Sequence, residues 1–272
     1  MAATRDRVLL FSILSLILAA LVDVAFYLLG GLANPFAGLA WGALRMYTPT
    51  VSALLVGDSE TLKRALRFSM KAFVYFLTSP LIAFAALLLY FAITAPMGFI
   101  SLETLRTAMP VDLPPETLLA LMLINSYIAA ISINTLFALG EEIGWRGFLQ
   151  VELEARGHST AKAALLVGLV WGVWHATAIL LLGHNYPENR LLGVALFTAF
   201  TVALSLPHAA VTRLSSSVLP AASLHGAINA IWALTILTST LPRELGGLGP
   251  LGIASWAIVS IANYLALLRL KR

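Results

Sequence analysis

The chain has 272 residues, of which 60% are apolar and only 11% are charged, and its mean hydropathy is +0.90. An ordinary soluble domain is about 25% charged, so this composition excludes a soluble globular protein. The net charge of +4 is spread over several short segments and forms no basic face, which argues against a nucleic-acid partner. The absence of cysteine excludes disulfides, zinc fingers, thiolate metal sites and a cysteine nucleophile.

Apolar segments of roughly 20 residues, the length that crosses a bilayer core of about 30 Å, recur along the whole chain. In chain order they cover residues 8–30, 36–56, 72–95, 118–140, 163–183, 191–206, 219–241 and 251–268. We therefore expect an all-α polytopic membrane protein with about eight transmembrane helices, forming one domain over residues 1–272. The first segment is too long for the apolar region of a cleavable signal peptide, so we expect it to be a retained anchor.

The positions of Lys and Arg between these segments predict an orientation. With the N-terminus in the cytosol, most basic residues fall in cytosolic loops, and the opposite side holds only Arg106, Arg190 and Arg243. This alternation holds at every loop, as the positive-inside rule requires. We therefore expect an integral protein of the cell membrane, surrounded by the lipid bilayer, with both termini in the cytosol.

Ionisable groups inside apolar segments are costly and by default mark a functional site. Such groups occur in three places, with the motif-bearing core at about residues 118–241. The fourth segment ends in Gly-Glu-Glu-Ile-Gly-Trp-Arg (140–146), the fifth contains Trp-Gly-Val-Trp-His (171–175), and the seventh contains His-Gly-Ala-Ile-Asn (225–229). Counted along the helices from basic loop residues, the three groups lie at similar depths, so they can converge on one pocket in the cytosolic half.

Helical spacing gives the two neighbouring glutamates different roles. Glu142 and Arg146 are four residues apart and can pair on one helix face, whereas Glu141 is rotated by about 100° and faces elsewhere. A carboxylate left unpaired in a low-dielectric pocket suits a general base. The alternative is a glutamate pair in a solvated loop, where the helix leaves the membrane.

His225 and Asn229 are also four residues apart and share a helix face. An imidazole N–H and a carboxamide can both donate hydrogen bonds, and donors aimed at a developing oxyanion lower the barrier to acyl transfer. The alternative is a histidine that only packs between helices with a satisfied hydrogen bond.

Taken in this order, Glu-Glu-x-x-x-Arg, aromatic-x-x-x-His and His-x-x-x-Asn resemble the CAAX-processing and bacteriocin-processing group of intramembrane proteases, which includes the Ras-converting endopeptidases. The resemblance implies that Glu141, helped by His175, activates a water molecule. It also implies that His225 and Asn229 stabilise the tetrahedral oxyanion. The expected activity is cleavage of a membrane-associated peptide or a lipid-modified, CAAX-type peptide, in a cavity open to the cytosolic leaflet.

The resemblance further implies that Glu142 and Arg146 hold the site together. Trp171 stands where the family usually has phenylalanine, and we expect this side chain to pack. Gly168 and Gly172, four residues apart, are expected to permit close packing of another helix beside the fifth segment.

Zinc is an alternative to a glutamate-activated water, with His175, His225 and Glu141 as ligands. The chain has no His-Glu-x-x-His motif and Arg146 competes for Glu142, so we expect no metal or other cofactor. Two non-protease functions remain open: a membrane immunity or scaffold protein that keeps the pocket for binding, and a proton-coupled transporter. The transporter is disfavoured because no inverted repeat is visible.

Other polar residues have simpler explanations. His158, His184 and His208 are expected to be solvated in loops or at helix ends. Asp23 is best explained by a contact between helices, and Arg45 either by snorkelling to an interface or by a place along the substrate route.

Overall fold

The computed structural model describes residues 2–32, 34–57, 59–108 and 111–270. Lys271 and Arg272, which are expected to be basic residues on the cytosolic side, lie outside these ranges. Within them every named element is a helix, and the only β contact is an isolated bridge between Ile100 and Ser239, so the all-α prediction is confirmed. The helices are α1 (Ala2–Leu28), α2 (Pro35–Met46), α3 (Thr48–Val56), α4 (Ser59–Ala65), α5 (Met70–Thr78), α6 (Pro80–Thr94), α7 (Glu103–Ala108), α8 (Pro115–Ala130), α9 (Ile133–Glu142), the π-helix η1 (Ile143–Leu149), α10 (Gln150–Ala155), α11 (Thr160–Trp174), α12 (Ala176–Leu182), α13 (Arg190–Ser215), α14 (Leu219–Ile231), α15 (Leu234–Leu237) and α16 (Pro250–Leu270).

Five helical segments in the described part of the chain are long and apolar enough to cross a membrane. They are Arg7–Leu28, Met70–Thr94, Thr160–Leu182, Arg190–Ser215 and Leu219–Leu237. A sixth is formed if α8 and the helix that continues from α9 to Ala155 count as one span, although these two are bent by 51°. The count of eight spans and the cytosolic position of both termini therefore stay predictions.

The second predicted span is broken into two short helices at Tyr47. Pro49 has no N–H to donate to the carbonyl of Arg45, four residues earlier. The hydroxyl of Thr48 donates to that carbonyl instead, at 2.9 Å. The break therefore has a local cause in the sequence, and it fixes where α2 ends and α3 begins.

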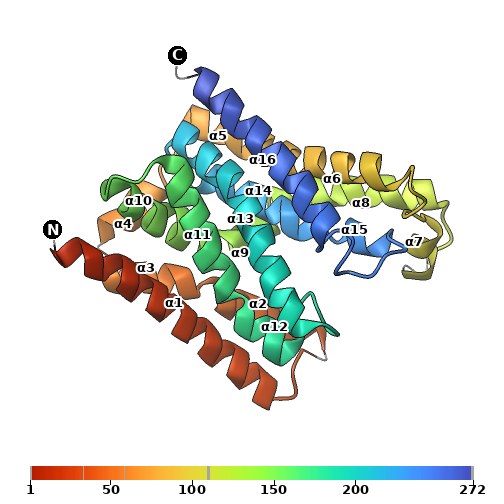
Figure 1. Ribbon diagram of the computed structural model, residues 1–272, viewed down its shortest axis with the longest axis horizontal. Helices are drawn as coiled ribbons and strands as arrows, with labels where there is room; N and C mark the ends of the chain where they lie inside the picture. The colour runs from red at the N-terminus through yellow and green to blue at the C-terminus, as the bar shows by residue number, and fades with distance from the viewer. Residues whose placement is uncertain (1, 33, 58, 109–110, 271–272) are drawn as a thin grey trace.

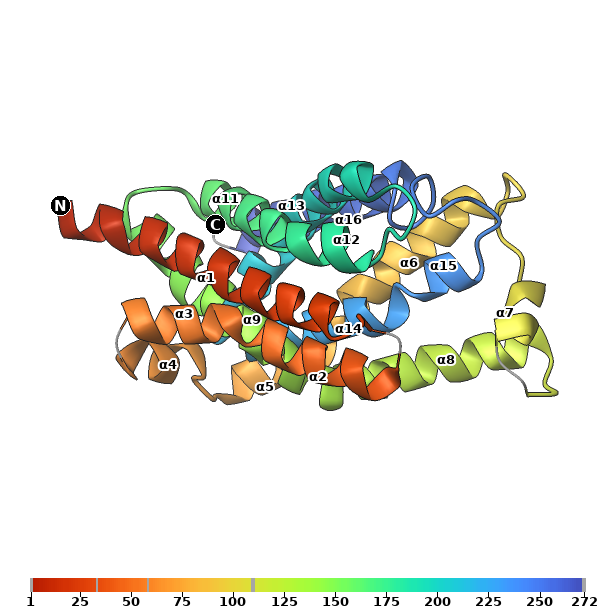
Figure 2. The same cartoon turned by 90° about the horizontal axis from the view of Figure 1, so that it is seen from below.

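The helices form an elongated bundle (Figures 1 and 2). Figure 2 shows the start of α1 together with α4 and α10 at the left end of the molecule, and α7 and α15 towards the right end. Three segments with basic residues that predict the cytosolic side, the start of α1, α4 and α10, thus lie at one end of the bundle.

α11 and α13 pack closely along their lengths (Figure 1). A Cβ atom at Gly168 would lie 2.7 Å from the Cα of Val202, and one at Gly172 would lie 2.5 Å from the Cα of Thr198. Only glycine allows this approach, so the expected packing role of the two glycines is confirmed.

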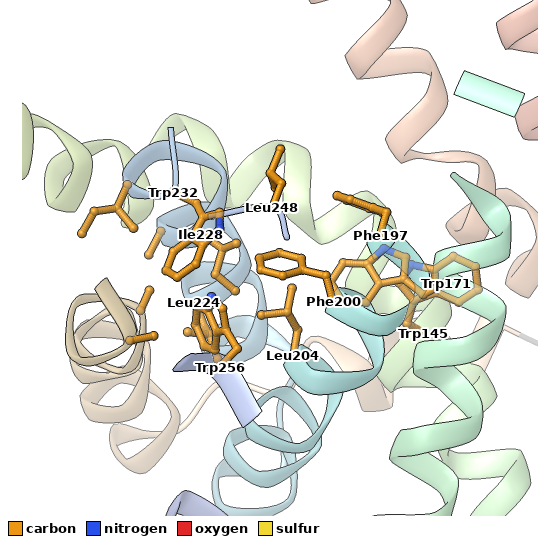
Figure 3. Close-up of a cluster of buried hydrophobic side chains, with 14 of the residues drawn as sticks. Trp145, Trp171, Phe197, Phe200, Leu204, Leu224, Ile228, Trp232, Leu248 and Trp256 are labelled. Carbon is orange, nitrogen blue, oxygen red and sulfur yellow. The ribbon is translucent and has the colours of Figure 1, made fainter. Parts of the chain in front are cut away.

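A buried aromatic cluster joins α13, α14 and α16 to α11 and η1 (Figure 3). Phe200 and Trp232 have ring centroids 5.7 Å apart, and Trp232 and Trp256 have centroids 5.5 Å apart. Trp145 and Trp171 lie at the other side of the same cluster (Figure 3). This packing fixes the helices that carry the three sequence motifs relative to one another.

α13 continues through Pro207, beyond the end of the predicted segment 191–206, so the expectation that His208 lies at a helix end is wrong. Proline cannot donate to the carbonyl four residues earlier, that of Ala203. The hydroxyl of Ser260 on α16 donates to this carbonyl at 2.5 Å and satisfies it. His208 therefore lies inside a helix and is fully buried, and it is not solvated as expected.

Candidate active site

A cavity of about 290 Å³ is lined by Glu141, His175, His225 and Asn229. Glu141 comes from the end of α9, His175 from the junction of α11 and α12, and the other two from α14. The structure thus brings together all four residues that the sequence analysis named as catalytic. Further walls are formed by Trp41, Arg45, Trp171, His184, Phe197 and Trp232.

Glu141 is buried and held by two indole groups. Its Oε2 accepts hydrogen bonds from Nε1 of Trp171 at 2.6 Å and from Nε1 of Trp145 at 3.2 Å. Its Oε1 lies 3.9 Å from Nε2 of His225. Trp171 therefore does more than pack, because its N–H orients the carboxylate, which a phenylalanine could not do.

Glu142 and Arg146 form the expected pair, with Nη1 of Arg146 3.1 Å from Oε1 of Glu142 and both side chains buried. The same Oε1 accepts a hydrogen bond from Nδ1 of His225 at 2.8 Å. Arg146 also donates from Nη2 to Ser205 at 3.2 Å and lies 4.8 Å from the centroid of the Trp171 ring. Glu142 is therefore a structural anchor for His225, a link that the spacing of the motifs did not predict.

His175 is fixed in orientation at the end of α11. Its Nδ1 donates to the carbonyl of Trp171 at 2.9 Å, since a carbonyl can only accept. In the neutral ring, Nε2 is then a hydrogen-bond acceptor. The rings of Trp174 and Phe197, with centroids 4.7 and 4.4 Å away, hold the imidazole in place.

Asn229 lies one turn after His225 on α14, and its side chain is exposed at the cavity. Its carboxamide is thus accessible to a bound molecule, on the same helix face as His225.

A second buried ion pair lies in the cavity wall. Nε of Arg45 is 2.9 Å from Oδ1 of Asp23, and Nη2 of Arg45 donates to the carbonyl of Trp174 at 2.6 Å. Trp41 donates to the same Oδ1 at 2.8 Å, and Thr177 donates to Oδ2 at 2.5 Å. Asp23 therefore makes the expected contact between helices, but Arg45 does not snorkel to an interface. Opposite charges in two successive apolar segments were the sequence feature that could have predicted this pair.

His184, in the loop after α12, lines the cavity and is not simply solvated as expected. Its ring lies 5.0 Å from that of Trp41. Desolvation, and secondly the charge of Arg45, lower the pKa of His184 to about 4, so this histidine is neutral at pH 7.

His208 is a second histidine that was expected to be solvated and that lies close to the site. One carboxylate oxygen of Glu142 and one ring nitrogen each of His208 and His225 lie within 4.8 Å of one another, and all three residues are buried. Thr201, Ser205 and His208 are spaced as i, i+4 and i+7, a polar stripe on an apolar helix. That stripe was the pattern that could have placed His208 inside the protein.

This group does not match the zinc ligands considered from the sequence. Among the described residues it is the group of three whose geometry suits a metal ion, and it contains neither Glu141 nor His175. Arg146 also bonds Glu142 there and adds a positive charge beside it. The arrangement therefore does not fit a catalytic zinc held by His175, His225 and Glu141.

The fold and the cavity define a membrane-embedded protein with a buried carboxylate and imidazole site. Residues 115–231 match the family model described as Rce1-like, type II CAAX prenyl endopeptidase Rce1-like. This segment runs from α8 to the end of α14 and contains the four cavity residues named above. This part of the chain is thus similar to the CAAX-processing endopeptidases, and the long apolar helices are those of an integral membrane protein. No curated protein matches the chain.

Proposed function

We propose that the chain is a metal-free intramembrane endopeptidase in which Glu141 activates the water that attacks a peptide bond. The observation that carries this proposal is the different setting of two adjacent carboxylates. Glu141 faces a cavity shared with His175, His225 and Asn229, whereas Glu142 is bound to Arg146 and His225.

The attacking water binds between Glu141 and His175. Two indole N–H groups hold Oε2 of Glu141, which leaves Oε1 to accept a proton from the water. His175 orients the water through the lone pair on Nε2, since its Nδ1 is committed to a backbone carbonyl. A well-placed general base contributes about 10²- to 10⁴-fold to such a reaction.

The oxyanion is stabilised by His225 and Asn229. Because Nδ1 of His225 donates to Glu142, Nε2 donates only when the ring carries a second proton. The carboxylates of Glu141 and Glu142, on either side of the ring, stabilise that cation. The amide of Asn229 adds a second donor. Collapse of the tetrahedral intermediate breaks the C–N bond, and Glu141 returns its proton to the leaving amine.

The substrate that suits this site is a membrane-associated or lipid-modified peptide of the CAAX type, which matches the prenyl endopeptidase description of the family. The positions of the basic residues support a cavity in the cytosolic half of the cell membrane, because the positive-inside rule predicts cytosolic loops rich in Lys and Arg. The peptide reaches the cavity from the cytosolic leaflet, while a lipid group stays in the bilayer.

Cleavage of a matched pair of fluorogenic peptides tests the proposal. The purified protein is incubated in detergent with prenylated and unprenylated forms of one CAAX peptide, and the products are identified by mass spectrometry. We expect cleavage by the wild type before and after dialysis against chelators, and none by Glu141→Ala. Binding without cleavage would instead indicate a scaffold or immunity protein, and activity lost on chelation and restored by zinc would indicate a metallopeptidase.

A further inference from the structure

Three buried polar atoms beside the Glu142–Arg146 pair have no hydrogen-bond partner among the described residues. They are Oε2 of Glu142, Nε of Arg146 and Nε2 of His208. Glu142 and Arg146 are joined at 3.1 Å through their other atoms, and His208 lies within 4.8 Å of Glu142. Buried polar groups are normally satisfied, so three unpartnered atoms around one ion pair need an explanation.

Each of the three atoms can be assigned as a hydrogen-bond donor or acceptor. Nδ1 of His208 is 2.8 Å from the carbonyl of Leu204, which can only accept, so this nitrogen carries the proton. Nε2 of the neutral ring is then an acceptor, as is Oε2 of Glu142. Nε of Arg146 is a donor. The group therefore offers two acceptors and one donor.

A water molecule is complementary to this set. It donates one hydrogen to each acceptor and accepts from the arginine, and buried waters make about three hydrogen bonds to otherwise unsatisfied groups. A divalent cation would suit the two acceptors, but it would leave the N–H of Arg146 unmatched and face its positive charge.

We propose that Glu142, Arg146 and His208 bind one buried water, and that His208 is a positioning residue that acts through it. The kinetic part of this inference rests on the proposed function. Oε1 of Glu142 already accepts from Arg146 and His225, so a fixed water on Oε2 holds the carboxylate in a single orientation.

The orientation of Glu142 affects the cavity, because Glu142 holds the ring of His225. His225 is bonded to Glu142 through Nδ1, and its Nε2 lies 3.9 Å from Glu141. His208 has its ring 5.9 Å from that of His225 and is not among the residues that line the cavity. It therefore influences the reaction through Glu142 and His225 and does not touch the substrate.

A high-resolution structure of the wild-type protein in lipid nanodiscs tests the water site without any substrate. We expect one density peak at hydrogen-bonding distance from Oε2 of Glu142, Nε of Arg146 and Nε2 of His208, with no metal detected by elemental analysis. A metal ion at this position, or three atoms with no shared peak, would overturn the proposal.

Two substitutions of His208, compared in the peptide assay, distinguish the role of Nδ1 from that of Nε2. His208→Asn keeps a donor for the carbonyl of Leu204 but loses the acceptor at Nε2, whereas His208→Gln places an amide oxygen near Nε2. We expect His208→Asn to lower kcat about tenfold at unchanged KM, and His208→Gln to stay within about threefold of the wild type. His158→Asn, in the loop between α10 and α11, is the control and should change neither constant.

The kinetic comparison and the nanodisc structure can be contradicted by different results. Equal kcat values for His208→Asn and His208→Gln, or an effect confined to KM, would contradict the positioning role. If the wild type cleaves no peptide, the proposed function fails, but the nanodisc structure still decides whether the water site exists.

Discussion

The two adjacent glutamates, Glu141 and Glu142, have different chemical roles because they contact different groups. Among the described residues, the hydrogen bonds to Glu141 come from the neutral N–H groups of Trp145 and Trp171, whereas Glu142 binds the guanidinium of Arg146. A buried carboxylate with neutral donors can take and release a proton, while one paired with a buried arginine is held as an anion. A change at either position should therefore have a different consequence.

Glu142→Gln should destabilise the protein, because it leaves Arg146 buried and unpaired. We expect a loss of about 3 kcal/mol, seen as a lower melting temperature in detergent, together with lower activity. A joint Arg146→Gln change should recover part of the stability. Glu154→Gln is the control, since its pair with Arg213 is partly exposed and should contribute under about 1 kcal/mol. An unchanged melting temperature for Glu142→Gln would contradict this account.

Trp171→Phe should lower activity without unfolding the protein. The substitution keeps an aromatic ring against Arg146 but removes the hydrogen bond of 2.6 Å to Glu141. We expect kcat to fall about tenfold, the effect of one lost hydrogen bond to a charged group, with little change in melting temperature. Trp256→Phe is a matched control, because the buried Nε1 of Trp256 has no partner among the described residues. Equal activity of the two variants would show that Trp171 only packs.

At the scale of the helices, a hydrogen bond from α16 keeps α13 continuous. Ser260→Ala should cost about 1 kcal/mol of unfolding free energy, because the partly buried carbonyl of Ala203 loses its donor. In a Pro207→Ala background, the backbone N–H at position 207 can take over this bond, so the same serine change should cost clearly less. Unfolding of the four proteins in denaturing detergent measures both costs, and equal costs would show that Pro207 is not the reason for the serine contact.

Local and distant causes explain which features the sequence could predict. The Glu142–Arg146 pair depends on spacing within one helix, so the residues alone predict it. The continuity of α13 depends on Ser260, on another helix, so a proline in the sequence wrongly indicated a helix end. Trp171 was expected only to pack, because its hydrogen bond goes to Glu141 on another helix, α9. Long-range partners, which a single sequence does not reveal, account for these errors.

At the scale of the whole molecule, the orientation in the membrane remains a prediction that labelling can test. The chain has no native cysteine, so a single introduced cysteine reports one position. We expect Arg243→Cys to react with an impermeant maleimide only from outside the cell, and Lys162→Cys only from the cytosolic side. Reaction of Arg243→Cys from the cytosolic side would contradict the eight-span arrangement.

In the described part of the chain, two fully buried Arg–carboxylate pairs lie near one cavity. The buried ion pair of Asp23 and Arg45 and that of Glu142 and Arg146 lie next to one cavity, and each arginine contacts an aromatic ring. Charges inside a membrane protein are expensive, so their collection around a single cavity indicates that this cavity carries the function.

The cleavage rate of Glu141→Gln tests the central claim most directly. Glutamine keeps the shape of the side chain and an oxygen that accepts from the indoles, but it cannot accept the proton of the attacking water. We predict a fall of at least about 10² in the rate of peptide cleavage, with a melting temperature close to that of the wild type. Cleavage by folded Glu141→Gln at the wild-type rate would contradict the assignment of Glu141 as the base.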